Sequence, residues 1–153
     1  MTAKLNPALR LRRAARIIVL DPAGCALMFR FDVPGRDPFW VTAGGECDPG
    51  ESFVDAAGRE LFEETGIVIT DPGPELARLT PEFVTVEGEQ VQADERYFIV
   101  QVADTDIDTS QHTELERQVV SSHRWFTLSD LSDWPEAVFP VELSDMIRSH
   151  IAT

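Results

Sequence analysis

Three glutamates of one predicted helix, Glu60, Glu63 and Glu64, have the type and spacing best suited to chemistry. Spacings of three and four residues place them on one stripe of a helix. Like charges on one stripe destabilise a helix, and the helix dipole disfavours anions near its C-terminal end. A hard divalent cation removes this conflict, because Mg²⁺ takes carboxylate oxygens and keeps sites for water and phosphate. The alternative is a solvated acidic face, which is common in acidic proteins.

The helix itself is predicted over Phe53 to Thr65 by signals at both ends. Ser52 can cap its N-terminus, with Asp55 completing a capping box, and Gly66 can end it in a left-handed conformation. At about 100° per residue one side is predicted to face the core. That side consists of Val54, Ala57, Gly58, Leu61 and Phe62. The glycine is interpreted as close packing on a sheet.

The wider segment decides between a metal site and a solvated face. Gly45 is followed by five residues, Glu51, seven residues, and then the run Arg59-Glu60-Leu61-Phe62-Glu63-Glu64-Thr65-Gly66-Ile67. This is a complete match to the Nudix box, G-x5-E-x7-R-E-U-x-E-E-x-G-U, in which U is apolar. At average residue frequencies a chance match at one position is on the order of 10⁻⁹. The chain therefore resembles the Nudix hydrolase superfamily of the MutT type.

The resemblance extends beyond the box. The apolar run Ala14 to Leu20 resembles the first strand of the family, and Trp40 to Gly45 is similar to the usual approach to the box, with Ala43 where the family commonly has proline. Arg124-Trp125-Phe126 resembles the last strand. The fold implied is an α/β/α sandwich around a mixed β-sheet.

The resemblance also implies roles for the box residues. Glu60 and Glu64 would be the central metal ligands, and Glu63 a third ligand or the holder of a metal-bound water. The backbone carbonyl of Gly45 often completes such a site. Glu51 and Arg59 resemble the pair that orients these carboxylates, a task suited to an arginine fork. The cofactor expected is Mg²⁺, with Mn²⁺ as the alternative ion.

The expected reaction is attack of water on a phosphorus of a diphosphate, with a carboxylate removing the proton. The family varies in which carboxylate acts. Glu63 of the box is one candidate, and Glu114 and Glu116, expected in a loop between Ala103 and Arg117, are others. We favour Glu116, although two solvated loop acids are an equally good interpretation.

Residues for substrate recognition are less clearly marked. Phe39, Trp40 and Tyr97 can stack on a nucleobase, while Arg30 and Arg36 can contact phosphate. The alternatives are core aromatics and surface arginines. The substrate-binding candidates we retain are Arg30, Phe39 and Tyr97.

Several functions fit the box. The favoured one is hydrolysis of a nucleoside triphosphate, normal or oxidised, to a monophosphate and pyrophosphate. Hydrolysis of ADP-ribose or a dinucleotide uses the same box, although such enzymes often carry an N-terminal extension. A non-catalytic nucleotide sensor is the alternative from another class, and the intact carboxylates argue against it. An isopentenyl diphosphate isomerase would need a cysteine such as Cys47, but no supporting motif accompanies it.

The surrounding elements alternate between strands and helices. The predicted strands cover residues 14–20, 26–31, 39–42, 76–86, 91–102 and 121–126, and short helices are predicted near Ser129 and from Pro140 to His150. This pattern predicts a mixed sheet covered by helices, in the α/β (α+β) class.

Length and charge set further limits. The 153 residues predict one domain, with residues 1–13 forming a solvated basic arm. The net charge of −14 argues against long nucleic acids as partners, and no apolar run predicts a membrane span. Cys25 and Cys47 are expected to be free thiols in the cytoplasm. The expected partner is a small nucleotide-like substrate, and both a monomer and a homodimer remain open.

Overall fold

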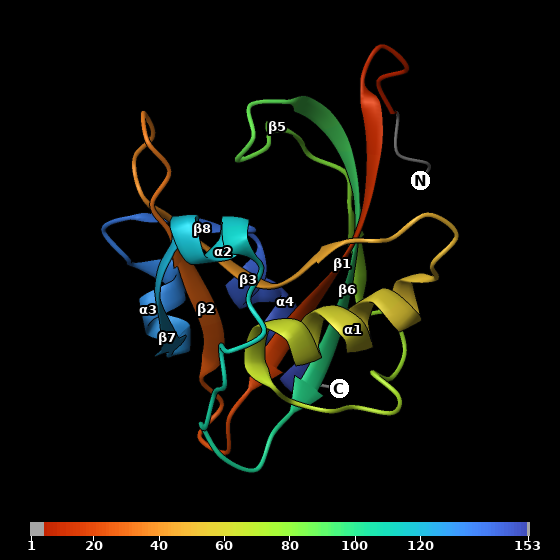
Figure 1. The fold of residues 1–153 in the computed structure, drawn as a ribbon. Helices are drawn as coiled ribbons and strands as arrows, with labels where there is room; N and C mark the ends of the chain where they lie inside the picture. Colours follow the sequence, from red (N-terminus) through yellow and green to blue (C-terminus); the bar gives the residue numbers. More distant parts are fainter. Residues whose placement is uncertain (1–4, 153) are drawn as a thin grey trace.

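The fold, taken from a computed structural model that describes residues 5–152, is built on one mixed β-sheet of eight strands (Figure 1). The strands are β1 (Arg10–Leu20), β2 (Ala26–Phe31), β3 (Phe39–Glu46), β4 (Ala77–Leu79), β5 (Glu82–Val84), β6 (Gln90–Gln101), β7 (Val120–Phe126) and β8 (Ala137–Phe139). The helices are α1 (Phe53–Thr65), α2 (Glu114–Val119), α3 (Leu128–Ser132) and α4 (Leu143–Ala152). Among the described residues, no helix is long and apolar enough to cross a membrane.

Strand β3 changes its hydrogen-bonded partner strand along its length. Its first half, Phe39 to Thr42, pairs antiparallel with β2, while Phe39 to Val41 also pair parallel with β8 on the other side. Its second half, Ala43 to Glu46, pairs antiparallel with β1. β1 in turn pairs in parallel with β6 over its whole length. The end of β3 thereby lies alongside the middle of β1, below the upper arms of β1 and β6 in Figure 1.

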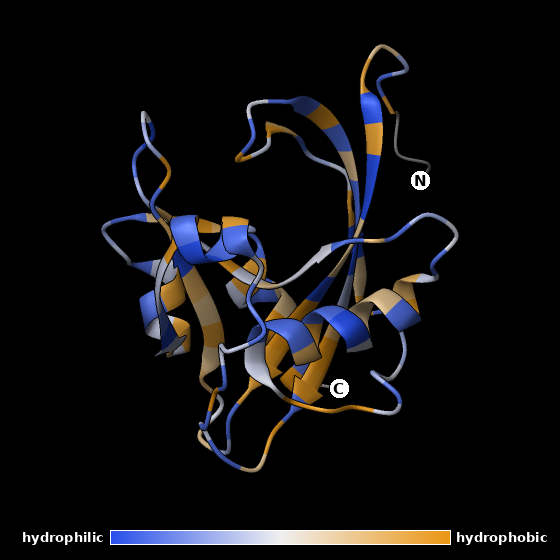
Figure 2. Cartoon of the chain, in the orientation of Figure 1, coloured by the Kyte–Doolittle hydropathy of each residue, from blue (hydrophilic) through white to orange (hydrophobic). Residues whose placement is uncertain are grey.

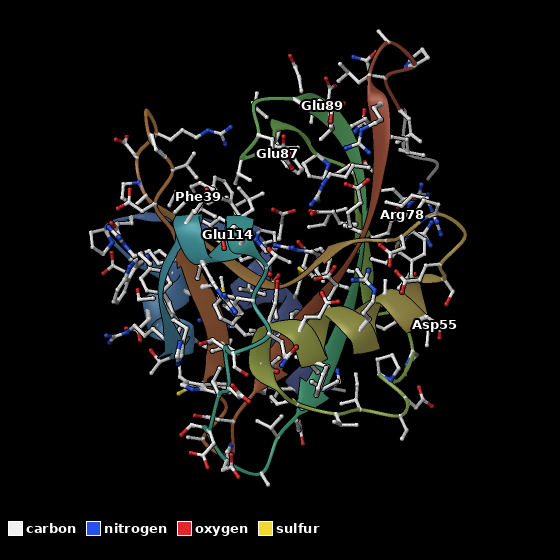
Figure 3. All side chains as sticks on the ribbon, viewed as in Figure 1. Phe39, Asp55, Arg78, Glu87, Glu89 and Glu114 are labelled. Atoms are coloured by element: carbon white, nitrogen blue, oxygen red, sulfur yellow. The ribbon has the colours of Figure 1, made fainter. Side chains whose placement is uncertain are left out.

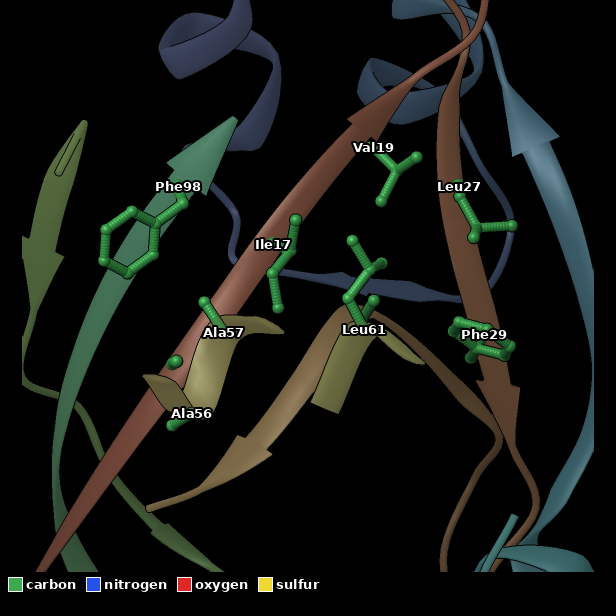
Figure 4. Close-up of a cluster of buried hydrophobic side chains, with 10 residues drawn as sticks. Ile17, Val19, Leu27, Phe29, Ala56, Ala57, Leu61 and Phe98 are labelled. Atoms are coloured by element: carbon green, nitrogen blue, oxygen red, sulfur yellow. The ribbon is translucent and has the colours of Figure 1, made fainter. Parts of the chain in front are cut away.

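Two apolar cores lie on opposite faces of the sheet. On one face, Ala56, Ala57 and Leu61 of α1 pack against strand side chains including Ile17 and Phe98 (Figure 4). On the other face, α4 contributes Leu143 and Ile147 to a cluster that includes Ile18, Trp40, Tyr97 and Phe126. Orange segments mark the lower sheet in Figure 2, while α1 and the upper arms are mixed in hydropathy. Helices on both faces of a mixed sheet confirm the predicted sandwich.

Helix α1 has the predicted boundaries. Ser52 caps it by accepting a hydrogen bond from the Asp55 backbone N–H at 3.1 Å, and Gly66 ends it with φ 75°. The core-facing side was partly wrong. Ala57 and Leu61 are buried as predicted, but Val54 and Phe62 are exposed. Helical periodicity alone does not say how wide a stripe the neighbouring sheet covers.

Gly58 does not have the predicted close packing on the sheet. A Cβ placed there would meet only the carbonyl oxygen of Ile69, at 3.9 Å. That is an ordinary van der Waals contact, so the backbone at this glycine is not pressed against a strand.

The other differences concern segments with weak local signals. The predicted strand over residues 76–86 is two strands, β4 and β5, separated by Thr80 and Pro81, because proline has no N–H for the ladder. The predicted loop over 103–117 contains the start of α2, and β8 was not predicted. The C-terminal helix begins at Leu143 rather than Pro140.

The predicted basic arm over residues 1–13 is also different. Strand β1 begins at Arg10, and the side chain of Arg12 is only 20% exposed. Lys4 lies outside the described residues. The arginines therefore belong to the sheet and not to a solvated extension.

Candidate active site

Two glycines at the end of β3 hold the central carboxylates of α1. The Gly44 backbone N–H donates a hydrogen bond to Glu64 Oε2 at 2.8 Å. A Cβ at Gly45 would lie 2.7 Å from the carboxylate of Glu60, which shows that this carboxylate rests against the backbone there. Gly44 also lies against β1, with φ 131° and room for no side chain, since a Cβ would be 2.1 Å from the carbonyl oxygen of Ala15. The glycines therefore bring β1, β3 and α1 together at the carboxylates.

Arg59 joins the remaining box residues into one network. Its guanidinium forms a fork with Glu51, at 2.9 and 2.8 Å. The Nη1 group donates to Glu60 at 3.0 Å and lies 3.3 Å from Glu63. The Nη2 group also donates to the carbonyl oxygen of Glu46, on β3, at 3.1 Å. Arg59 thus ties the helix to the strand and contacts the carboxylates of Glu60 and Glu63.

Burial makes the central carboxylates unusual acids. Burial, opposed by Arg59 and reinforced by the charge of Glu63, raises the pKa of Glu60 to about 7. Burial and the charge of Glu60 raise the pKa of Glu64 well above its usual range. The pKa of Glu51 is lowered, chiefly by its hydrogen bond from Arg59. A buried carboxylate, Glu64, beside a partly buried one, Glu60, with the pKa of both raised, forms an environment that favours a cation.

The protein side chains supply only some of the oxygen ligands that a hard divalent ion needs, and substrate and water would supply the others. In the described part of the chain, no three Asp, Glu, His or Cys side chains converge closely enough to form a complete metal cage. Glu63 is held toward Arg59 instead. Mg²⁺ does not require such a cage, because it usually binds one or two carboxylates and keeps water and substrate phosphate. Glu60 and Glu64, with the nearby backbone of Gly45, fit that pattern.

The two other candidate bases, Glu116 and Glu114, both lie on α2 but differ in their access to the cleft. Glu116 lines the same cleft as Glu60 and Glu64, and its charge contributes to raising the pKa of both. Its carboxylate also accepts a hydrogen bond from the Thr113 backbone N–H at 2.9 Å, in a capping box. Glu114 is exposed and is not among the residues lining the cleft. Neither residue is in a loop, contrary to the prediction.

The start of α2 is attached to α1 through a histidine that sequence reasoning left without a role. His112 is buried, and its Nε2 lies 3.0 Å from the Glu64 carbonyl oxygen. Its ring contacts that of Phe29 edge-on, at a centroid distance of 5.9 Å. This contact fixes the segment leading to Glu116 relative to α1.

The cleft that contains these carboxylates has a volume of about 1420 Å³. Phe39 contributes to an aromatic wall, stacking on Phe31 at 5.5 Å and meeting Phe139 edge-on at 6.1 Å. Figure 3 shows Phe39 on one side of the cleft, with Glu87 and Glu89, beside the β5–β6 turn, on the other. Phe39 is thus part of the cleft lining.

The other predicted recognition residues are placed differently. Tyr97 reaches the cleft wall but is only 2% exposed, so little of its ring is available for stacking. Trp40 is in the core, with its indole N–H donating to Glu136 at 2.8 Å. Arg30 is outside the cleft lining and forms a fork with Glu136 at 3.0 and 2.8 Å. Its observed contacts connect β2 to the segment before β8.

Arg36 lines the cleft, but its guanidinium donates to the backbone carbonyls of Val84 and Thr85. Its observed role is to join the loop before β3 to β5, across the cleft.

Sequence reasoning missed three arginines of β1 that also line the cleft, Arg10, Arg12 and Arg16. A signal for them was present. Residues 10, 12, 16, 18 and 20 share one face of a strand, and Ile18 and Leu20 on that face are buried. The alternation places the arginines on an inward face, whereas their charge predicts that they face solvent.

Comparison with known proteins agrees with the fold and the box. A family model for the NUDIX domain matches residues 10–146. The chain therefore belongs to the NUDIX domain family and is a Nudix hydrolase. A protein of Bacillus subtilis (strain 168) named putative 8-oxo-dGTP diphosphatase is 46% identical over 55 residues, which span 35% of this chain and 34% of that protein. The match thus covers about a third of the length of this relative.

Solved structures of low identity share the fold. The MutT protein from Methanosarcina mazei Go1 superposes with a TM-score of 0.68 at 19% identity, over 96% of this chain and 97% of that one. An ADP-ribose pyrophosphatase from Streptococcus suis 89-1591 gives a TM-score of 0.63 at 15% identity, over 93% and 92%. Neighbours with different named activities thus share one architecture.

Proposed function

We propose that this protein is a Mg²⁺-dependent hydrolase of a diphosphate bond in a small nucleotide-like substrate. The observation that carries the proposal is the pair of carboxylates, Glu60 and Glu64, held against Gly44 and Gly45 in the cleft. When bound, the ion supplies charge neutralisation at the phosphate oxygens and a lowered pKa for water. Mn²⁺ is the alternative ion for the same oxygen ligands.

The chain's own residues would divide the remaining work. Glu60 and Glu64 hold the ion, and Arg59 with Glu51 keeps Glu60 and Glu63 in position. Glu116 is the favoured general base, because it lines the cleft beside Glu60 and Glu64 whereas Glu114 does not. Its capping hydrogen bond from Thr113 leaves further lone pairs of the carboxylate available to accept a proton. Glu63 is the second candidate for this role.

The favoured substrate is a nucleoside triphosphate, normal or oxidised, cleaved to a monophosphate and pyrophosphate. The partial match to a putative 8-oxo-dGTP diphosphatase supports this choice. Hydrolysis of ADP-ribose or another dinucleotide is the second candidate, supported by the likeness to an ADP-ribose pyrophosphatase. A non-catalytic sensor is disfavoured, because every carboxylate of the box is present in the sequence. The reaction is expected in the cytoplasm.

The experiment is a substrate panel with product analysis on wild type and Glu64→Gln, with and without Mg²⁺. The panel contains normal and oxidised dNTPs, ADP-ribose, NADH and dinucleoside polyphosphates. The glutamine can still accept the hydrogen bond from Gly44, so the fold should persist, as circular dichroism would verify. We expect loss of most Mg²⁺-dependent turnover. A variant that keeps the wild-type rate would overturn the metal assignment.

The base assignment is tested with a matched pair on one helix, Glu116→Gln and Glu114→Gln. General-base catalysis typically contributes 10²–10⁴-fold, so kcat should fall by about that factor in the first variant. The second variant removes an exposed charge nearby and should leave kcat within about twofold. Equal effects in both variants would refute the choice of Glu116 over Glu114.

A further inference from the structure

A basic wall faces the carboxylates from strand β1. Arg10, Arg12 and Arg16 line the cleft, whereas Arg13 points to the opposite face of the sheet, where its guanidinium lies 4.5 Å from the ring centre of Phe53. The wall is built on the inward face of a strand whose neighbour β6 pairs with it throughout. In a chain of net charge −14, this concentration of positive charge along one wall of the cleft calls for an explanation.

The three arginines differ in how fully they are neutralised. Arg10, at the rim, has Glu46 at 2.6 Å and Glu89 at 3.0 Å. Arg12 shares Glu46 with it, at 3.5 Å, and is 20% exposed. Arg16 is 12% exposed, its nearest carboxylate is Glu95 at 3.8 Å, and its Nε is buried with no hydrogen-bond partner among the described residues. The deepest guanidinium therefore keeps one unused hydrogen-bond donor, although the charges of Glu95 and the other nearby carboxylates outweigh burial and raise its pKa.

Such an arrangement costs folding energy. A buried donor left without a partner carries a desolvation penalty, and two neighbouring cations repel each other. Burial and the charge of Arg16 both lower the pKa of Arg12. Departures from ordinary stability rules occur mainly where function requires them. An anion between these two side chains would supply the missing hydrogen bonds and balance the charge.

The position of the pair indicates which anion. Arg16 pairs in register with Gly44, the residue whose N–H holds Glu64. The charges of Glu64 and Glu60 act directly on the guanidinium of Arg16. An anion bound by the pair would therefore lie beside a diphosphate held at the carboxylates, within the same polyphosphate chain. A guanidinium suits this partner because its planar fork matches phosphate oxygens.

We propose that Arg12 and Arg16 form a phosphate subsite that receives a free terminal phosphate of the substrate. This rests on the proposed diphosphate hydrolysis and narrows it to nucleoside triphosphates. A diphosphate esterified at both ends, as in ADP-ribose, has no terminal phosphate to place there. The competing explanation is that the arginines only balance the charge of Glu95, Glu60 and Glu64.

Binding to the metal-free protein tests the subsite separately from catalysis. Inorganic tripolyphosphate is titrated calorimetrically into wild type, Arg12→Ala and Arg124→Ala in EDTA. Arg124 is the matched control, because it removes the same charge from β7, where its guanidinium lies 4.8 Å from the Trp134 ring centre, outside the cleft lining. Loss of a charge-assisted contact should weaken binding about 10- to 100-fold in Arg12→Ala. The control should change it less than about twofold.

Arg16 needs a milder change, because truncation at a buried position can unfold the chain. Arg16→Lys keeps the charge and removes the fork, so tripolyphosphate binding should weaken by about 10-fold while thermal unfolding remains cooperative. Unchanged binding in both Arg12→Ala and Arg16→Lys would overturn the subsite.

Kinetics distinguish a subsite from charge balance. Arg12→Ala should lower kcat/KM for a nucleoside triphosphate about 10- to 100-fold and for ADP-ribose less than about threefold. An equal loss on both substrates would assign the arginine to general charge balance and overturn the proposal. If the proposed hydrolase activity is wrong, Mg²⁺-dependent turnover will be absent on every substrate. The metal-free binding experiment would still test the subsite in that case.

Discussion

The raised pKa of Glu60 predicts that the metal-free protein loses stability as the pH increases. Its ordinary pKa is 4.5, and in the fold burial raises it to about 7. Between these two values the folded protein holds a proton that the unfolded chain releases. Stability therefore falls with increasing pH across this interval, and the full cost is present above pH 7.

The size of the effect follows from that interval. Each pH unit between the two pKa values is worth about 1.4 kcal/mol, so Glu60 alone should cost about 3 kcal/mol at pH 7.5. This is a substantial part of the roughly 5–15 kcal/mol that stabilises a typical domain. Glu64, whose pKa is also raised by burial, should add to the same trend.

The assay is urea unfolding in EDTA at pH values from 4.5 to 7.5, for wild type and Glu60→Gln. The glutamine stays neutral, so the variant should equal wild type near pH 4.5 and exceed it by about 3 kcal/mol at pH 7.5. Glu114→Gln, on exposed α2, should follow the wild-type curve. Mg²⁺ should restore the stability of wild type at pH 7.5 and of Glu60→Gln much less. Parallel curves for wild type and Glu60→Gln would refute the reasoning.

Three further substitutions test the packing around α1. Gly58→Ala should stabilise by about 0.5–1 kcal/mol, seen as a higher Tm, because the Cβ meets only Ile69 at 3.9 Å; a lower Tm would contradict the open packing. Gly66→Ala should lower stability by at least about 1 kcal/mol in urea unfolding, because φ is 75° and the Cβ would lie 2.9 Å from Asp108; an unchanged midpoint would contradict the cap. His112→Phe should cost about 1 kcal/mol by removing the contact to the Glu64 carbonyl, and a variant as stable as wild type would show that this contact contributes nothing.

The parts of the fold that could be predicted are those encoded locally. The bounds of α1 follow from a capping serine and a left-handed glycine, both of which act within one turn. The box is equally local, and the role of Glu60 and Glu64 as metal ligands is the prediction drawn from it. Helix α2 carries a complete capping box at Thr113 and Glu116, but no apolar periodicity drew attention to it. Strand β8, three residues long, depends on pairing with β3, which no local pattern encodes.

The opposing wall of the cleft could be predicted only in part. Strand alternation places Arg12 and Arg16 on an inward face, but the position of this face beside Glu64 depends on a tertiary event at β3. The change of partner after Thr42 places Gly44 between α1 and β1. The Gly44 N–H then donates to Glu64, and the neighbouring strand β1 places Arg16 in register with Gly44. Charge alone predicted that the arginines would be solvated, since lone guanidiniums are seldom buried. The proposed binding of a cation at one wall and of a polyphosphate between both walls would reverse that expectation, because each charged wall would then have a partner that the isolated strand lacks.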